Sequence, residues 1–325
     1  MIRVIQRMTM KKRRATSHSR RNRKMMHTML RTDKHWVWYT DSFYGYQKDL
    51  GVFAMASAVN QMASRGVEKC LIDAKITLPF SMQKSEIISM KKEMERAAKA
   101  LPVESLHVEG TVGCEAALPF ITVTAAGAAD EALLADATLT ARAGWDIVLT
   151  KWVGLEGMLR IAAEKEAVLA ARFTPVFLNQ IKSYTPQIFA LREIAVAKAM
   201  GVSVIRQIGE GGILASLHYL AQETGMGLSV DMKKISIKQE TIEVCEHFRL
   251  NPYQLTSHGC MLMLTNRGEE LADALVQDGI TASVIGRLNN GNDKVIHNGE
   301  DMRYIDRPAP DELTKIFLED AGSRQ

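Results

Sequence analysis

The chain has 325 residues, of which 46% are hydrophobic and 24% are charged, with four cysteines and a net charge of +4. This length suits two domains of ordinary size, and no apolar stretch approaches the roughly 20 residues that span a bilayer, which favours a soluble, cytoplasmic protein without a membrane partner. The cysteines are scattered and form no C-x-x-C pair, which disfavours a structural zinc site and a disulfide framework.

The basic charge is concentrated in residues 1–32, which hold eleven Lys and Arg and no acid, so the rest of the chain has 30 basic against 37 acidic residues. A basic arm of this kind can bind nucleic acid or an anionic surface. An Arg- and Ser-rich, acid-poor segment can also be an organellar transit peptide. The absence of usable periodicity favours a third interpretation, a disordered leader that does not decide the function.

From residue 33 the hydrophobic pattern alternates between strands and helices. Trp36, Trp38 and Tyr39 alternate as in a strand, where packing in the core or at a dimer interface is favoured over base stacking. The long helix that follows the second expected strand should begin at a Ser81 cap and end before Pro102. The expected elements are strands at 35–40, 69–80, 103–110 and 118–127, and helices at 48–66 and 81–101.

An Ala- and Asp-rich stretch near 128–144 is the expected domain boundary, giving an N-terminal domain at 33–143 and a C-terminal domain at 144–320. The second half mixes strands and helices without strict β-α-β alternation, which favours an α+β fold of two domains. Its last strands should form a hairpin that turns at Asn298-Gly299. The expected helices are 157–171, 186–200, 212–221, 239–248 and 267–279, and the expected strands are 146–150, 202–208, 227–231, 260–265, 282–288 and the hairpin at 293–305.

One of these connections raises a question of function. The segment "VIRQIGEGGILASLHYLA" runs from a strand through "GEGG" into an amphipathic helix. Gly211 and Gly212 stand where unpaired backbone N–H groups and the helix dipole could hold a phosphate. The alternative is that the glycines serve only a tight turn. The spacing matches neither of the two common phosphate-loop motifs, so the motif alone leaves both interpretations open.

The second half, with "GLEG", "EGGI" and "HGCML" in this order, resembles the C-terminal domain of the aminoimidazole-ribonucleotide (AIR) synthetase superfamily. Within that superfamily, the sequence most resembles the AIR-synthase-related branch of hydrogenase maturation proteins. The segments "TDSF", "AVNQMASRG", "ITLPFS" and "PFITVTAAG" stand where that superfamily has its N-terminal, ATP-binding and dimerising domain. The resemblance implies two AIR-synthase-like domains, a homodimer, ATP and Mg²⁺ between the domains, phosphoryl transfer if the protein is an active enzyme, and a maturation partner protein.

The resemblance also implies site residues. Asp41 matches a magnesium ligand, and Asn60 matches the Asn of an Asn-Asp pair whose acid is Gln61 here. Glu210, Gly211 and Gly212 match the family's Glu-Gly-Gly and would contact the cofactor. The family's His-Asp before that turn is replaced by Arg206-Gln207, and Glu109 and Glu115 are the only substitutes for a fourth acidic turn.

Because magnesium prefers several carboxylates, these replacements predict a degenerate metal site in a retained architecture. The sequence has no cysteine after Cys260, which disfavours the carbamoyl chemistry of the maturation branch. A nucleophilic pair of His258 and Cys260 is less favoured than a buried thiol. Three functions stay open: an ATP-binding maturation-like protein, a non-catalytic dimeric paralogue that acts as a partner or scaffold, and a nucleic-acid-associated protein that uses its basic leader.

Overall fold

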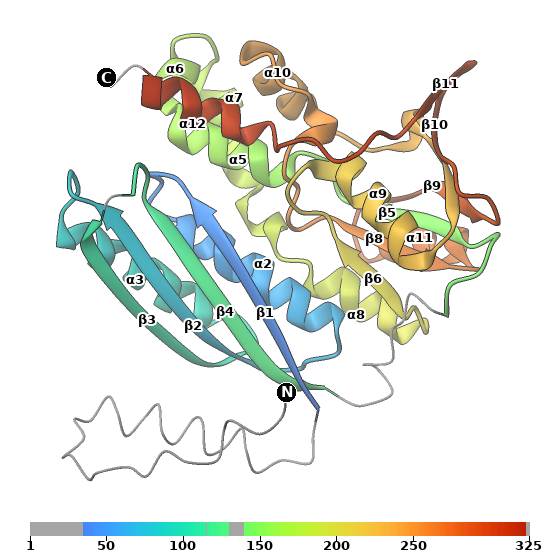
Figure 1. Cartoon of the computed structure of the whole chain (residues 1–325), viewed down its shortest axis with the longest axis horizontal. Coiled ribbons are helices and arrows are strands. Elements are labelled where there is room, and N and C mark those ends of the chain that lie inside the picture. The colour runs from blue at the N-terminus through green and yellow to red at the C-terminus, as the bar shows by residue number, and fades with distance from the viewer. Residues whose placement is uncertain (1–34, 115, 130–139, 323–325) are drawn as a thin grey trace, which may run out of the picture. The chain divides into compact units, whose positions relative to one another are not determined.

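Two β-sheets are built from separate stretches of the chain (Figure 1). The computed structural model describes residues 35–114, 116–129 and 140–322. The first sheet has four strands in the order β1-β4-β2-β3, with β2 antiparallel to β4 and parallel to β3. Its strands are β1 (His35–Tyr44), β2 (Cys70–Pro79), β3 (Val103–Cys114) and β4 (Phe120–Ala129).

Helices α2 (Leu50–Ser64) and α3 (Lys84–Ala98) pack against this sheet (Figure 1). α2 is buried almost all round because it contacts β4 of its own sheet and also elements of the second half. α3 buries only Met90 and Met94, and its other side faces solvent as its charged pattern predicts. Its N-cap is Gln83, so the expected Ser81 cap is wrong: two further residues turn before the helix begins.

The second sheet has seven strands in the order β11-β10-β7-β9-β5-β8-β6. β10 pairs parallel with β7, and every other pair in this sheet is antiparallel. The expected hairpin is confirmed, with Asn298 opposite Asp301 across the turn. The strands are β5 (Asp146–Thr150), β6 (Val204–Gln207), β7 (Gly227–Asp231), β8 (Met261–Thr265), β9 (Ala282–Asn289), β10 (Lys294–Asn298) and β11 (Asp301–Tyr304).

Both faces of this sheet are covered at its centre, which explains why β5 and β8 are buried along their whole length. Successive side chains of a strand point to opposite faces. Val148, Met261 and Met263 therefore pack with α8 (Leu191–Ala199) and α11 (Gly268–Gln277). The intervening side chains of both strands pack in the main core, which also holds α5 (Leu155–Glu164) and α9 (Gly212–Thr224).

Two expected helices are interrupted. The one expected at 157–171 divides at Lys165 into α5 and α6 (Glu166–Ala170), because the backbone of Lys165 leaves the helical region. The helix expected at 186–200 divides at Phe189, whose backbone is extended. It forms the short 3-10 helix η2 (Thr185–Ile188) and then α8. The remaining elements are α7 (Pro175–Ser183), η2 (Thr185–Ile188), η3 (Met232–Lys234), α10 (Gln239–His247), η4 (Pro252–Gln254) and α12 (Leu313–Gly322).

The α+β class is therefore confirmed, and residues 36–325 form one compact unit that contains both sheets. The expected boundary lies largely at 130–139 and the basic leader lies at 1–32, both outside the described residues. The assignment of two domains stays a prediction. In the described part of the chain, no helix has the length and apolar character needed to cross a membrane.

Candidate functional site

Asp41 of β1 is the residue that the resemblance assigns to magnesium, and its carboxylate is already engaged by protein groups. Its Oδ2 accepts hydrogen bonds from the Tyr39 hydroxyl at 2.8 Å and from Ser57 Oγ on α2 at 3.0 Å. Burial, together with the Asp41 charge, raises the pKa of Tyr39, so that phenol stays a protonated donor. Asp41 is therefore held in place by two neutral donors.

Glu156, in the first turn of α5, is a fully buried carboxylate. Its Oε2 lies 2.6 Å from His258 Nδ1 and accepts a hydrogen bond from Thr256 Oγ1 at 2.7 Å. Burial alone would raise the pKa of Glu156, but the charge and hydrogen bond of His258 outweigh it and lower this pKa to about 2. The carboxylate is therefore ionised inside the core.

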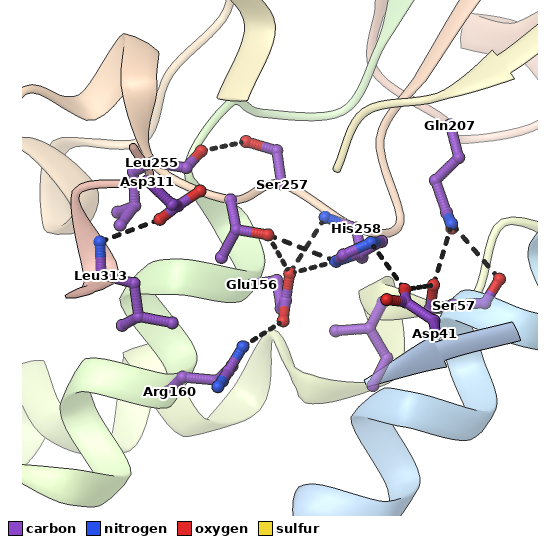
Figure 2. Close-up of polar contacts among 12 residues, drawn as sticks. Asp41, Ser57, Glu156, Arg160, Gln207, Leu255, Ser257, His258, Asp311 and Leu313 are labelled. Carbon is purple, nitrogen blue, oxygen red and sulfur yellow. Dashed lines mark hydrogen bonds and ion pairs between the residues drawn. The ribbon is translucent and has the colours of Figure 1, made fainter. Parts of the chain in front are cut away.

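His258 joins this buried acid to Asp41 (Figure 2). Its Nε2 lies 3.7 Å from Asp41 Oδ2, on the opposite side of the ring from Glu156. Burial alone would lower the pKa of His258, but the Glu156 charge, their hydrogen bond and then Asp41 outweigh it, so this pKa is raised. The imidazole therefore lies between two carboxylates that both favour its protonated form.

Arg160, one helical turn after Glu156, supplies a second cation. Its Nη1 donates to Glu156 Oε1 at 3.1 Å, and its guanidinium lies 5.4 Å from the centre of the Phe43 ring. Asp41, Glu156, His258 and Arg160 together carry two negative and two positive charges. We call these four residues the acid–histidine cluster; within it, two cationic side chains already pair with the carboxylates that a metal ion would need.

Glu210 adds the only further acid from the predicted set. Its side chain reaches solvent, and its pKa is raised by desolvation and by the negative charge of Asp41. Two of the predicted residues, Asp41 and Glu210, are thus brought to the same place, beside His258. Of the two substitutes for the fourth acidic turn, Glu109 is exposed on β3 and Glu115 lies outside the described residues.

Asn60 is instead part of a buried connection between α2 and the second half of the chain. Its Nδ2 donates to Gln207 Oε1 and to the Ile188 carbonyl, both at 2.8 Å, and its Oδ1 accepts from Ala190 N at 2.8 Å. Gln207 Nε2 donates to the Ser57 carbonyl at 3.2 Å. Both amides are used to hold protein segments together, so neither side chain is open to a ligand.

The turn of "GEGG" is also occupied by the chain itself. Gly211 N donates to Asp311 Oδ2 at 2.6 Å, and Asp311 Oδ1 accepts from Leu313 N at 2.8 Å. Burial raises the pKa of Asp311 to about 6, although these backbone hydrogen bonds oppose the shift. A carboxylate from the C-terminal segment therefore lies where the sequence suggested a phosphate.

Gly212 has a packing reason to be glycine. Its φ is +65°, and a Cβ there would lie 2.6 Å from the Tyr253 carbonyl oxygen. Gly211 also has a positive φ, of +75°. The glycines are thus required by the turn and by close packing against η4, which favours the turn interpretation of "GEGG".

Cys260 is no nucleophile. Its Sγ lies in the core, donates to the Trp152 carbonyl at 3.0 Å, and has a pKa that burial raises to about 12. The prediction of a buried thiol is confirmed. Sequence reasoning considered His258 only as a partner of this thiol, and it missed Glu156 and Asp311. The i,i+4 spacing of Glu156 and Arg160 was a signal that could have found one of them.

The donor set does not fit a magnesium ion held against phosphates. In the described stretches, no group of three or more His, Cys, Asp or Glu side chains could hold a metal ion. Magnesium binds in an octahedral arrangement of oxygen ligands that usually includes carboxylates. Here Asp41, the expected ligand, lies 3.7 Å from the imidazole of His258, whose pKa is raised.

Comparison with known proteins supports the resemblance drawn from the sequence. Residues 174–298 match the family model described as AIR synthase related protein, C-terminal domain. The chain is 23% identical over 247 residues to the carbamoyl dehydratase HypE of Rhodobacter capsulatus, covering 74% of this chain and 69% of that protein. It is 20% identical over 273 residues to a putative hydrogenase expression/formation protein of Methanocaldococcus jannaschii, covering 82% and 79%.

Solved structures show the same fold. A crystal structure of E. coli HypE, a hydrogenase maturation protein, matches with a TM-score of 0.72 and 17% identity, over 90% of this chain and 91% of that chain. The thiamine monophosphate kinase of Aquifex aeolicus matches with a TM-score of 0.59 and 16% identity, over 85% and 98%. The AIR-synthase-like fold and the resemblance to the hydrogenase maturation branch are therefore confirmed.

Proposed function

We propose that this protein is a hydrogenase-maturation-like protein that binds ATP or a related phosphate ligand weakly, without magnesium and without phosphoryl transfer. Support for a nucleotide comes from similar proteins: one matching structure is HypE in complex with ATP, with a TM-score of 0.65 and 16% identity over 87% of this chain and 88% of that chain. Asp41 and Glu210, which both interact with His258, are the side chains that we expect such a ligand to meet.

The observation that carries the proposal is the pairing of Asp41 with His258. A magnesium ion placed at Asp41 would meet an imidazolium whose nitrogen lies 3.7 Å from the carboxylate. The positive charge of the imidazolium would repel the metal ion. The histidine also already pairs with the carboxylate that the metal would need. Phosphoryl transfer depends on metal ions that neutralise the transferring phosphate. We therefore expect binding without turnover.

Titration calorimetry of the full chain with ATP tests this proposal. We expect the same weak dissociation constant with magnesium and with EDTA, and no release of inorganic phosphate over hours. The matched variant is His258→Gln, which removes the cation beside Asp41 and should make any binding more dependent on magnesium. Brisk magnesium-dependent hydrolysis by the wild type would overturn the proposal.

A second candidate function is that of a partner or scaffold that binds no nucleotide. It is favoured by the hydrogen bond from Gly211 N to Asp311, which fills the expected anion position with the chain's own carboxylate. A crystal structure of a HypE–HypF complex is among the similar folds, so the partner to test for binding is a maturation protein. In the same titration this candidate predicts no heat from ATP under either condition.

Homodimerisation also belongs to the proposal. β1 is an edge strand of its sheet, and Trp38 on it is 59% exposed, so this strand can offer its backbone and an aromatic side chain to a second copy. β2 is paired on both sides and cannot offer a free edge. A monomer in light scattering at micromolar concentration would exclude the dimer. The cytoplasmic location and the nucleic-acid role of the leader stay predictions.

A further inference from the structure

A pocket of about 430 Å³ lies away from the acid–histidine cluster, in the second half of the chain. It is enclosed by the first turn of α9, by η4, by the β10–β11 hairpin and by the connection at 305–309. Pockets that hold small ligands begin at about 300 Å³, so this one is large enough for a compact organic molecule. None of the residues discussed for magnesium lines it, although Gly211 of the predicted cofactor set does.

The inner surface of the pocket is apolar and aromatic. Leu214 of α9, Ile296 of β10 and the buried Ile305 contribute aliphatic side chains. Tyr253 of η4 and Tyr304 of β11 contribute rings, and Tyr304 is 60% exposed. A ligand that brings an apolar body would bury this surface, and the rings would add contact area at a small cost in conformational entropy.

Four charged side chains line the same pocket: Asp301, Arg303, Asp306 and Arg307. All four are exposed, and none of them makes an ion pair or a side-chain hydrogen bond within the stretches that the structure describes. Two are acids and two are arginines, so the set has no net charge. A polyanion would be attracted by the arginines and repelled by the aspartates in equal measure.

We infer that the pocket binds a small zwitterion with an apolar body, such as a hydrophobic amino acid or dipeptide. A carboxylate of the ligand would take bidentate hydrogen bonds from a guanidinium, and its ammonium group would pair with an aspartate. The aliphatic and aromatic surface would receive the side chains. This site is separate from the acid–histidine cluster and does not depend on the proposed binding of ATP.

The test is calorimetry of the full chain with phenylalanyl-leucine, with free phenylalanine, and with the N-acetylated and C-amidated forms of the dipeptide. We expect the unblocked dipeptide to bind and each blocked form to bind about tenfold or more weakly, since each loses one charge-assisted pair. Comparing free phenylalanine with the dipeptide shows which of the two ligand sizes the pocket binds more tightly. Because the four charged side chains are exposed, substitutions there should leave the thermal midpoint nearly unchanged.

The double variants Arg303→Gln with Arg307→Gln, and Asp301→Asn with Asp306→Asn, should each weaken the dipeptide about tenfold or more. The control is Lys233→Gln. Lys233 is an exposed cation that lies near Gly299, the turn residue of the β10–β11 hairpin, but Lys233 does not line the pocket. Adenosine monophosphate serves as an anionic probe. Equal binding of the blocked and unblocked dipeptides, binding of the nucleotide by the wild type as tight as that of the dipeptide, or no heat at millimolar dipeptide would each overturn the inference.

Discussion

Asp41 Oδ2 lies 3.7 Å from His258 Nε2, and through this contact β1 of the first sheet meets the loop that leads into β8 of the second. The same imidazole holds the fully buried Glu156 on its other side. One imidazole therefore lies against an acid of each half of the molecule.

Replacing His258 with Gln should lower the free energy of unfolding by about 3–5 kcal/mol, because it leaves the buried Glu156 with only Arg160 as a cationic partner. Chemical denaturation at neutral pH measures the loss. The matched control is His107→Gln: His107 Nδ1 also lies 2.6 Å from a carboxylate, that of Asp73, but this pair is partly exposed. We expect a loss below about 1 kcal/mol there.

The double variant of Glu156→Gln with His258→Gln should lose less stability than the sum of the two single losses, since each single change already breaks the ion pair between the two residues. A double variant that is less stable than the sum of both single losses would contradict a direct ion pair. Loss of stability in His258→Gln no larger than in His107→Gln would contradict the charged state of the cluster.

Restoring an acid at Gln207 should destabilise the protein and should not create a magnesium site. Gln207 is buried, accepts from Asn60 and donates to the Ser57 carbonyl. Gln207→Glu keeps the acceptor but turns an oxygen toward that carbonyl, which we expect to cost about 1–3 kcal/mol. Urea unfolding with and without magnesium measures both effects.

The control for this change is Gln61→Asp, on the same helix as Asn60 but half-buried, which should change stability by much less. If magnesium stabilised the Gln207→Glu variant but not the wild type, the expectation would be wrong and the site would be only one acid away from metal binding.

Much of this architecture could be predicted from the sequence because its signals are local. The Asn298-Gly299 turn lies between two alternating strands, and the hairpin forms there as expected. The helix expected at 186–200 failed because Phe189 adopts an extended backbone, while its neighbour Ala190 donates its N–H to Asn60 of a distant helix. No local pattern contains that contact.

The site was less predictable for the same reason. Asp41 and Glu210 were expected from the resemblance and do lie close to His258, but whether a carboxylate is free for a metal depends on its neighbours in space. The carboxylate of Asp311 reaches Gly211 only because the chain returns to α9 after the last hairpin. Residue spacing in the sequence gives no sign of this return.

Asp311 should make stability fall as pH rises from about 4 to 6. Its pKa is 3.8 in the unfolded chain and about 6 in the folded protein, so over this range the folded state binds more protons than the unfolded state. Stability therefore decreases until the carboxyl is ionised in both states, and is then constant with respect to this group. Thermal or urea unfolding from pH 4 to 7 measures it.

Asp311→Asn removes this titration, so the difference in unfolding free energy between wild type and variant should change across pH 4 to 6 and level off above about pH 7. The variant also loses one acceptor, for Gly211 N or for Leu313 N, at a cost of about 1 kcal/mol. A difference that is independent of pH would show that burial does not raise this pKa.

Gly212→Ala should destabilise the protein far more than the same change at Gly225. The two glycines have nearly the same backbone, with φ of +65° and +64°, so alanine meets the same left-handed penalty of about 1–2 kcal/mol at each. A Cβ at Gly225 meets nothing within 4 Å, whereas a Cβ at Gly212 would lie 2.6 Å from the Tyr253 carbonyl and 2.8 Å from that of Leu255. Both obstacles are backbone and cannot move aside as a side chain could. We therefore expect an additional loss at Gly212 of about 1–3 kcal/mol in urea unfolding.

A larger substitution such as Gly212→Asp would report on this packing and not on phosphate binding. Equal losses at the two positions would mean that η4 yields easily, and the glycine would then be needed for the turn alone.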